Sequence, residues 1–160
     1  MWNKLSNNLL EKNHIKIPIE KRFFLTFIEN DENNIHKNKI IETLNKNGFY
    51  DDDPRLKKFF SNIKALVNTN NLNYEEFKYC TENHICILKQ ILKGECVIPK
   101  FNIFCSEIEK LYDQSYECKG GKNADYIPQL SRVNPESYGL SICTIDGQRY
   151  NKGETKVEFT

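Results

Sequence analysis

The pattern of apolar residues changes near residue 116, and this change constrains the fold more than any other feature of the sequence. Before it, apolar residues recur at steps of three and four, which is typical of amphipathic helices. After it, Gly120-Gly121 interrupts the helical pattern, and residues 138–145 alternate as in a β-strand. The sequence therefore predicts a bundle of four or five short helices over roughly the first 115 residues, followed by the beginning of a β-containing domain.

Asparagine-rich segments separate the helical blocks. The clearest block is expected to begin at Asp53-Pro54, with the aspartate as cap and the proline in the first turn, and to continue to Val67. A second block, residues 74–93, is expected to form one helix that stops at Gly94. Further helices are expected around three more apolar groups, at residues 23–28, 40–44 and 101–112.

The last part of the chain contains the signals of a β-hairpin. Asp146-Gly147 favours a two-residue type I′ turn, because both central positions of that turn need a positive φ. Residues 156–159 are expected to begin another strand. An isolated hairpin is only marginally stable, so these strands predict a sheet whose other members are not in this chain. The fold class is therefore an α+β fragment.

Composition excludes several kinds of partner. The 23 Lys and Arg residues nearly cancel the 22 Asp and Glu residues in this chain of 160, so we expect no nucleic acid partner. No apolar run approaches the ~20 residues needed to cross a bilayer, so we expect no membrane insertion. Residues 1–11 lack the apolar core of a signal peptide, and we do not expect a secreted protein.

The cysteines and histidines do not suggest a metal site. The six cysteines form no Cys-x-x-Cys pair, so we expect no zinc and expect reduced thiols buried as small hydrophobic groups. His84 lies on an apolar helix face, where a hydrogen-bonded core histidine is a better interpretation than a ligand. Gly120-Gly121-Lys122 lacks the first glycine and the final Ser or Thr of a phosphate-binding loop, so no nucleotide cofactor is expected.

A helix, an Asn- and Asp-rich loop and a second helix occur twice, which is the order of a pair of EF-hands. Aligning the loops on Ile35 and Leu72 places Lys39 and Glu76 at position 12, where calcium-binding loops carry a bidentate glutamate. In the first loop, Asn30 and Glu32 offer oxygen ligands at positions 3 and 5, but Ile28 stands at position 1 and the cation Lys39 at position 12. In the second loop, Ala65 and Val67 stand at positions 1 and 3, and only Glu76 fits the pattern. The sequence predicts an EF-hand-like pair without bound metal.

Several segments of the chain match the pattern of one enzyme family. The most specific is the run from Gly120 to Leu130, which contains Asp125-Tyr126-Ile127-Pro128. The others are residues 53–57, 97–101, 143–149 and 153–157. Together these segments resemble animal kidney/liver-type glutaminases. Three residues depart from the family pattern: Tyr150 stands where histidine is common, Glu154 where aspartate is common, and Glu158 where proline is common.

The resemblance implies a serine-dependent amidohydrolase of the β-lactamase-like class that converts L-glutamine to L-glutamate and ammonia. Its nucleophile would be the serine of a Ser-x-x-Lys motif, with the lysine as base. We expect the chain to lack this motif, which would lie beyond Thr160, and we expect the chain alone to be inactive. Tyr126 is the one catalytic position that the resemblance places inside the chain, as a proton donor or acceptor. From residue type alone, Tyr126 would simply pack against Pro128.

The resemblance also implies the domain organisation. We expect a flexible segment at residues 1–18, an EF-hand-like helical domain at 19–95, and at 96–160 a linker and the first hairpin of a β-lactamase-like α/β catalytic domain. A homo-oligomer is expected, as is a mitochondrial location or otherwise a cytoplasmic one, with no cofactor and no substrate-binding residue inside the chain. The alternative is a non-catalytic helical module for binding or oligomerisation, supported by the apolar stripes of residues 54–67 and 74–93.

Overall fold

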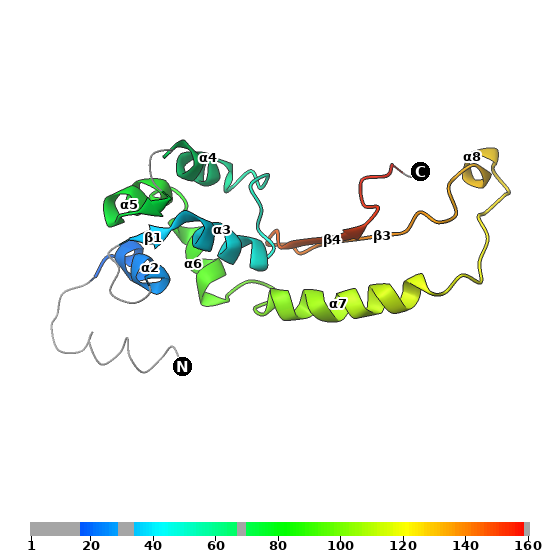
Figure 1. Ribbon diagram of the computed structural model, residues 1–160, viewed down its shortest axis with the longest axis horizontal. Coiled ribbons are helices and arrows are strands. Elements are labelled where there is room, and N and C mark those ends of the chain that lie inside the picture. Colours follow the sequence, from blue (N-terminus) through cyan, green and yellow to red (C-terminus); the bar gives the residue numbers. More distant parts are fainter. Residues whose placement is uncertain (1–16, 29–33, 67–69, 159–160) are drawn as a thin grey trace.

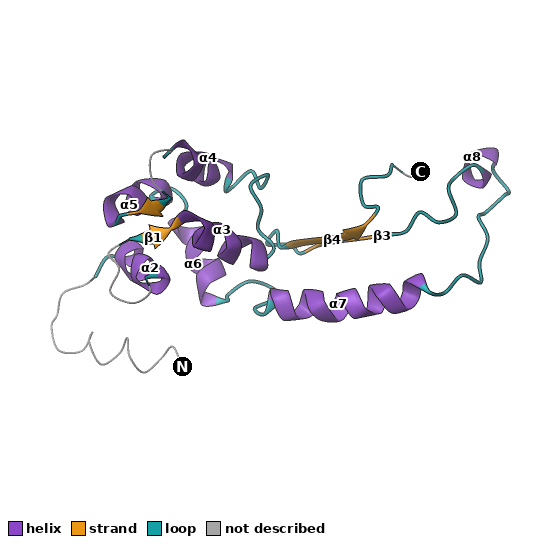
Figure 2. Ribbon diagram, in the orientation of Figure 1, coloured by secondary structure: helices purple, strands orange, loops and turns teal. Residues whose placement is uncertain are grey.

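The computed structural model of the protein describes residues 17–28, 34–66 and 70–158. Helices α2 to α6 form a bundle at one end, α7 leads away from it beside the hairpin β3–β4, and α8 lies at the far end (Figures 1 and 2). The expected order of a helical bundle followed by a hairpin is confirmed. The elements are, in order, α2 Ile19–Phe27, β1 Ile35–His36, α3 Lys37–Lys46, α4 Lys57–Ala65, β2 Asn71–Leu72, α5 Tyr74–Thr81, α6 Ile85–Lys93, α7 Phe101–Tyr116, α8 Pro128–Ser131, β3 Gly139–Cys143 and β4 Arg149–Gly153.

The bundle contains two helix-loop-helix units, α2–α3 and α4–α5, which are joined by the strands β1 and β2. These strands pair antiparallel, with Ile35 opposite Leu72 and His36 opposite Asn71. Ile35 and Leu72 are both buried, and they are the two residues that the loop alignment places at the same position. The predicted EF-hand-like pair is therefore confirmed.

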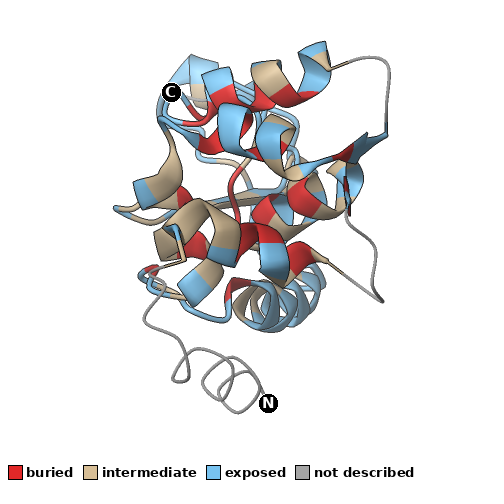
Figure 3. Ribbon diagram, turned by 90° about the vertical axis from the view of Figure 1, so that its left-hand side faces the viewer, coloured by how far each residue is buried: buried red, intermediate tan, exposed pale blue. Residues whose placement is uncertain are grey.

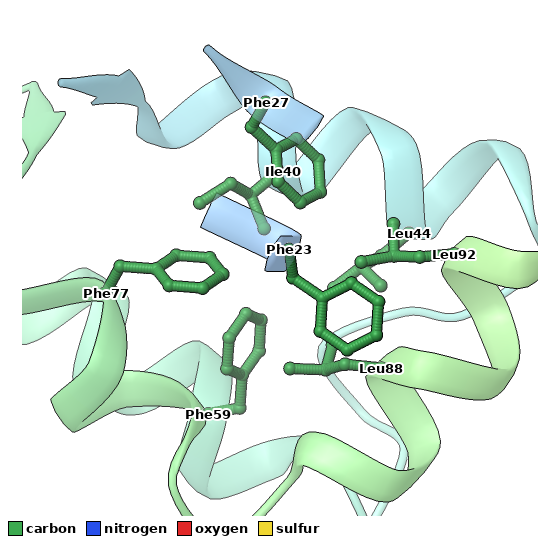
Figure 4. A pocket seen from close by; sticks show the side chains of 8 residues that line it. All are labelled: Phe23, Phe27, Ile40, Leu44, Phe59, Phe77, Leu88 and Leu92. Atoms are coloured by element: carbon green, nitrogen blue, oxygen red, sulfur yellow. The ribbon is translucent and has the colours of Figure 1, made fainter. Parts of the chain in front are cut away.

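An aromatic core holds the bundle together. Phe24 meets Tyr74 and Phe77 edge to face, with ring centroids 5.4 and 5.6 Å apart. Buried residues lie on the inward faces of the helices, whereas most of α7 is exposed (Figure 3). At the centre, side chains from α2 to α6 converge on a cavity of about 10 Å³, which leaves no room for a ligand larger than water (Figure 4). Its lining consists of Phe23, Phe27, Ile40, Leu44, Phe59, Phe77, Leu88 and Leu92.

Helix α4 begins at Lys57, so the expected start at Asp53-Pro54 is wrong. The Asp53 carboxylate does not cap the helix, because it accepts hydrogen bonds from the backbone N–H and the guanidinium of Arg55, at 2.9 and 2.7 Å. The helix ends at Ala65, and Val67 lies outside the described residues.

The single helix expected over residues 74–93 is in fact two helices, α5 and α6, separated by a turn at residues 82–84. The expected stop at Gly94 is confirmed, with a φ of 66°. His84 lies in the turn, where its ring meets Phe59 edge to face. Its buried Nε2 has no hydrogen-bond partner within the described residues, so the expectation of a hydrogen-bonded core histidine is wrong.

The hairpin pairs in register from Gly139 opposite Gly153 to Cys143 opposite Arg149. Its connection differs from the expected type I′ turn. Gly147 N–H donates to the Thr144 carbonyl at 3.0 Å, and Gly147 itself has a φ of 89°, which is the geometry of a three-residue loop with a glycine bulge. Residues 156–158 form a turn and a bend rather than the start of the expected third strand, and Phe159 lies outside the described residues.

We expect Gly48→Ala to lower the free energy of unfolding by about 2 kcal/mol. Gly48 follows α3 with a φ of 83°, and an added Cβ would lie 2.5 Å from the Phe101 ring and 2.8 Å from the Arg149 backbone nitrogen. Urea denaturation followed by circular dichroism measures the change. Gly120→Ala is the control, because its Cβ would meet nothing within 4 Å. Equal midpoints for the two variants would contradict this close approach.

Candidate functional site

The turn of the β3–β4 hairpin contacts the helical bundle through Gln148, whose side chain is 0% exposed. Its Nε2 donates to the carbonyls of Asn47 and Ile98, at 3.2 and 3.0 Å, and its Oε1 accepts from Ile98 N–H at 2.9 Å. Beside it, Arg149 N–H donates to the Gly48 carbonyl at 2.8 Å. The hairpin, the end of α3 and the segment before α7 therefore share one buried hydrogen-bonded cluster.

Two arginine–carboxylate pairs surround this cluster. Arg55 pairs with Asp53 and also donates to the Asp146 carbonyl at 2.8 Å, whereas Arg149 pairs with both oxygens of Asp52. Burial alone would raise the pKa of Asp53, but hydrogen bonds from Arg55 outweigh it and hold that pKa below its ordinary value. Because the folded-state pKa is lowered, this stabilisation is present at neutral pH and is lost as the pH falls below about 4.

A second set of contacts holds the hairpin against α7. The Lys152 ammonium lies between two carboxylates of α7, 2.8 Å from Asp113 Oδ1 and 2.9 Å from Glu109 Oε1. Hydrogen bonds to Asp113 and then Glu109 raise the pKa of Lys152. The Tyr112 hydroxyl donates to the Tyr138 carbonyl at 3.1 Å. These contacts hold β4 and Tyr138, the residue before β3, against α7.

An open groove of about 500 Å³ runs between α7 and the hairpin. Most of its lining is apolar or aromatic, and Leu111 on this face is 59% exposed. Exposed apolar surface of this kind commonly contacts another segment or protein. The groove is lined by Ile108, Leu111, Tyr112, Gln114, Ser115, Cys118, Tyr138 and Leu140.

Tyr126 lies in the segment between α7 and α8, at the end of the molecule away from the bundle (Figure 1). Its side chain is 80% exposed, and its hydroxyl makes no hydrogen bond within the part of the chain that the structure describes. Local polar contacts shape the segment: Lys122 pairs with Asp125 at 3.2 Å, and Asn123 Nδ2 donates to the Val133 carbonyl at 2.5 Å. The phenol is therefore free to meet groups supplied from elsewhere.

The sequence does contain one Ser-x-x-Lys motif, Ser61-Asn62-Ile63-Lys64. The expectation that the chain lacks this motif is therefore wrong. These residues lie on α4 in the helical bundle, at the opposite end of the molecule from α8 (Figure 1). Ser61 is exposed, and the Lys64 ammonium pairs with Asp51 at 2.6 Å. The structure does not bring this serine and lysine together with Tyr126.

The cysteines only partly follow the sequence expectation. All six are free thiols; Cys80 and Cys96 are buried, Cys105 is half-buried, and the remaining three are exposed. Burial raises the pKa of Cys80 and of Cys96 to about 11. Among the described residues, no group of three or more His, Cys, Asp or Glu side chains is arranged to hold a metal ion.

Sequence reasoning missed Gln148, which is the centre of the hairpin contact. A glutamine beside an Asp-Gly turn is expected to be exposed to solvent. The hydrogen-bond partners of Gln148 lie 50 and 101 residues away in the chain. No short-range pattern identifies such a contact. Within the described ranges, no helix is both long and apolar enough to cross a membrane.

Comparison with known proteins adds two family matches. A model of the EF-hand domain matches residues 19–99, and a model described as glutaminase matches residues 121–160. The mitochondrial liver isoform of glutaminase from Rattus norvegicus is 35% identical over 140 residues, which are 85% of this chain and 23% of the relative. A putative glutaminase 2 from Caenorhabditis elegans is 32% identical over 153 residues, 88% of this chain and 25% of the relative.

A shorter match reaches bacteria. The glutaminase of Bacteroides thetaiotaomicron is 44% identical over 52 residues, which are 32% of this chain and 16% of the relative. The chain thus spans about a quarter of the length of the animal relatives, and those alignments are long enough to include both matched domains.

Proposed function

Because the chain belongs to the glutaminase family and carries an EF-hand domain before its glutaminase segment, we propose that it is the N-terminal part of an enzyme that hydrolyses L-glutamine to L-glutamate and ammonia. The observation that carries the proposal is the alignment of 140 residues with a liver-type glutaminase, which is longer than either domain alone. In this proposal, the EF-hand domain holds the first hairpin of the catalytic domain through the contacts of Gln148.

Tyr126 is proposed as the catalytic residue that this part of the enzyme contributes. Its exposed and unbonded phenol supports that role, since it can reach groups outside the described chain. In the β-lactamase-like mechanism, a serine attacks the side-chain amide of glutamine, the C–N bond breaks, and the nitrogen takes up a proton and leaves as ammonia. Water then hydrolyses the ester to give glutamate. A tyrosine near the serine and lysine can donate or accept the protons that these steps move.

We propose that the domains divide as expected from the sequence: a leading segment at residues 1–18, the EF-hand domain at 19–95 and the catalytic domain from 96. Residues 1–16 lie outside the described residues. A mitochondrial location is proposed because the rat and mouse relatives are named as mitochondrial isoforms. A homo-oligomer is proposed on family grounds, and light scattering of the purified enzyme would measure its mass.

The alternative of a non-catalytic binding module loses its main support. The apolar stripes of α4, α5 and α6 face the core of the chain itself, where Phe59, Phe77 and Leu88 are all buried. The open groove beside α7 is the remaining surface that favours a binding role.

The test compares two purified proteins: one that contains this chain and a complete glutaminase domain, and the 160-residue chain alone. We expect the first to release ammonia and glutamate from L-glutamine with saturation, and not from L-asparagine. The second is expected to release none above a buffer blank, because the nucleophile is proposed to lie beyond Thr160. Failure of the longer protein to release ammonia would overturn the proposed function, and turnover by the chain alone would overturn the location of the nucleophile.

A further inference from the structure

The first turn of α3 carries two lysines whose ammonium groups reach the ends of two other helices. Lys39 Nζ donates to the carbonyl of Phe27, the last residue of α2, at 3.0 Å. Lys37 Nζ donates to the carbonyl of Leu66, the residue that caps the end of α4. One helix therefore supplies a positive charge to the C-terminal end of each entering helix of the EF-hand pair.

The Lys39 contact lies where calcium would act. In the loop alignment, Phe27 directly precedes position 1 and Lys39 stands at position 12, which in a calcium-binding loop carries the bidentate glutamate. A bound calcium ion links these two ends of the loop, because both contribute ligands to it. Here the side-chain ammonium at position 12 binds the entering helix directly. The same two helices are thus connected without a metal ion.

The Lys37 contact connects the two loops to each other. Besides its ammonium contact with Leu66, Lys37 donates its backbone N–H to the Asn70 carbonyl at 2.9 Å. Leu66 and Asn70 belong to the second loop, and both contacts lie next to the β1–β2 pair. At position 12 of this loop, Glu76 accepts from Asn73 N–H at 2.9 Å in a capping box, so its carboxylate serves the start of α5.

Helix electrostatics explains why lysines suit these positions. The last carbonyls of a helix have no partner within the helix and lie at the negative end of its dipole. An ammonium group satisfies such a carbonyl and neutralises this end, as a metal cation would.

The interior of the pair is also already occupied. Helix α6 packs Leu88 and Leu92 into the core against α2, and the remaining cavity is about 10 Å³ (Figure 4). In calcium sensors, opening of the EF-hand helices exposes a groove that binds a target helix. Here such opening would first have to expel a helix of the same chain.

From these contacts we infer that Lys39 and Lys37 replace bound calcium as the cross-links of the EF-hand pair, which makes the pair a fixed scaffold rather than a calcium-operated switch. The charge that holds the helices is part of the sequence and does not depend on the concentration of an ion.

Replacement of each lysine by methionine tests the inference, because methionine keeps an unbranched apolar chain and removes the ammonium. We expect Lys39→Met and Lys37→Met each to lower Tm by about 2–6 °C, and the double variant to lower it further. Lys39→Arg, which keeps a cationic donor, is expected to recover most of the loss. Lys58→Met is the matched control on the exposed side of α4 and is expected to melt as the parent protein does.

The second measurement is the effect of calcium itself. The Tm of the parent chain is expected to be the same in millimolar CaCl₂ and in EDTA, and calcium is expected not to restore either methionine variant. A rise in the Tm of the parent with calcium would overturn the inference, even if the variants proved insoluble. Methionine variants that melt with the Lys58→Met control would overturn it as well.

Discussion

In the longer glutaminase proposed above, Tyr126→Phe is expected to lower kcat for glutamine hydrolysis by roughly 10²- to 10⁴-fold, the usual contribution of a general acid or base. The substitution removes one oxygen atom and keeps the ring. Because the side chain is 80% exposed and its hydroxyl makes no hydrogen bond within the described chain, we expect no change in Tm. Coupled measurement of glutamate release gives kcat and KM, and calorimetry gives Tm.

Tyr79→Phe is the matched control, since this phenol is 63% exposed on α5 in the EF-hand domain. It should keep the parent kcat. Equal kcat values for the two variants would remove Tyr126 from the proposed catalytic centre. A loss of activity accompanied by a large fall in Tm would instead assign Tyr126 a structural role.

Gln148→Leu is expected to lower the free energy of unfolding by about 3–5 kcal/mol. The leucine would leave Ile98 N–H and the carbonyls of Ile98 and Asn47 buried without partners, and each unsatisfied group costs roughly 1–3 kcal/mol. Urea denaturation of the 160-residue chain measures the loss, and hydrogen exchange of the β4 amides shows whether the hairpin has detached.

Gln148→Glu separates hydrogen bonding from size. Glutamate has nearly the same shape and can still accept from Ile98 N–H, but its ionised carboxylate would face two carbonyl oxygens and cannot donate to them. We therefore expect it to be no less destabilising than leucine at pH 7. The exposed Gln129→Leu should leave stability unchanged. Stabilities of all three variants within 0.5 kcal/mol of the parent, the usual range for surface substitutions, would show that the buried cluster does not hold the hairpin.

Local patterns in the sequence were sufficient for the elements that depend on local physics. Helical periodicity predicted α7, and Gly94 marked the end of α6 because a left-handed position favours glycine. The repeated loop pattern predicted the EF-hand-like pair, and the structure places Ile35 and Leu72 opposite each other in it. These features depend on residues close together in the chain or on a repeat, so the sequence alone carries them.

The remainder depends on contacts that are distant in sequence or on competing local bonds. Periodicity continues through residues 82–84, so it could not reveal the turn that lets α6 fold back on α2. Asp53 has the chemistry of a helix cap, but Arg55 competes for its carboxylate and the helix starts later. For Tyr126, the family pattern predicted a catalytic role, and its exposed side chain supports that role. The described residues do not place a serine and a lysine beside it.

The distance in sequence between Gln148 and Asn47 also bears on how the protein is made. This contact spans 101 residues and forms only after Gln148 has been synthesised, whereas the helices of the bundle are complete at Lys93. On the ribosome, the bundle can therefore fold first. The Asn47 carbonyl is then already in place to accept the hydrogen bond from Gln148 when the hairpin is synthesised. The N-terminal helices would then act as an intramolecular template for the hairpin that follows them.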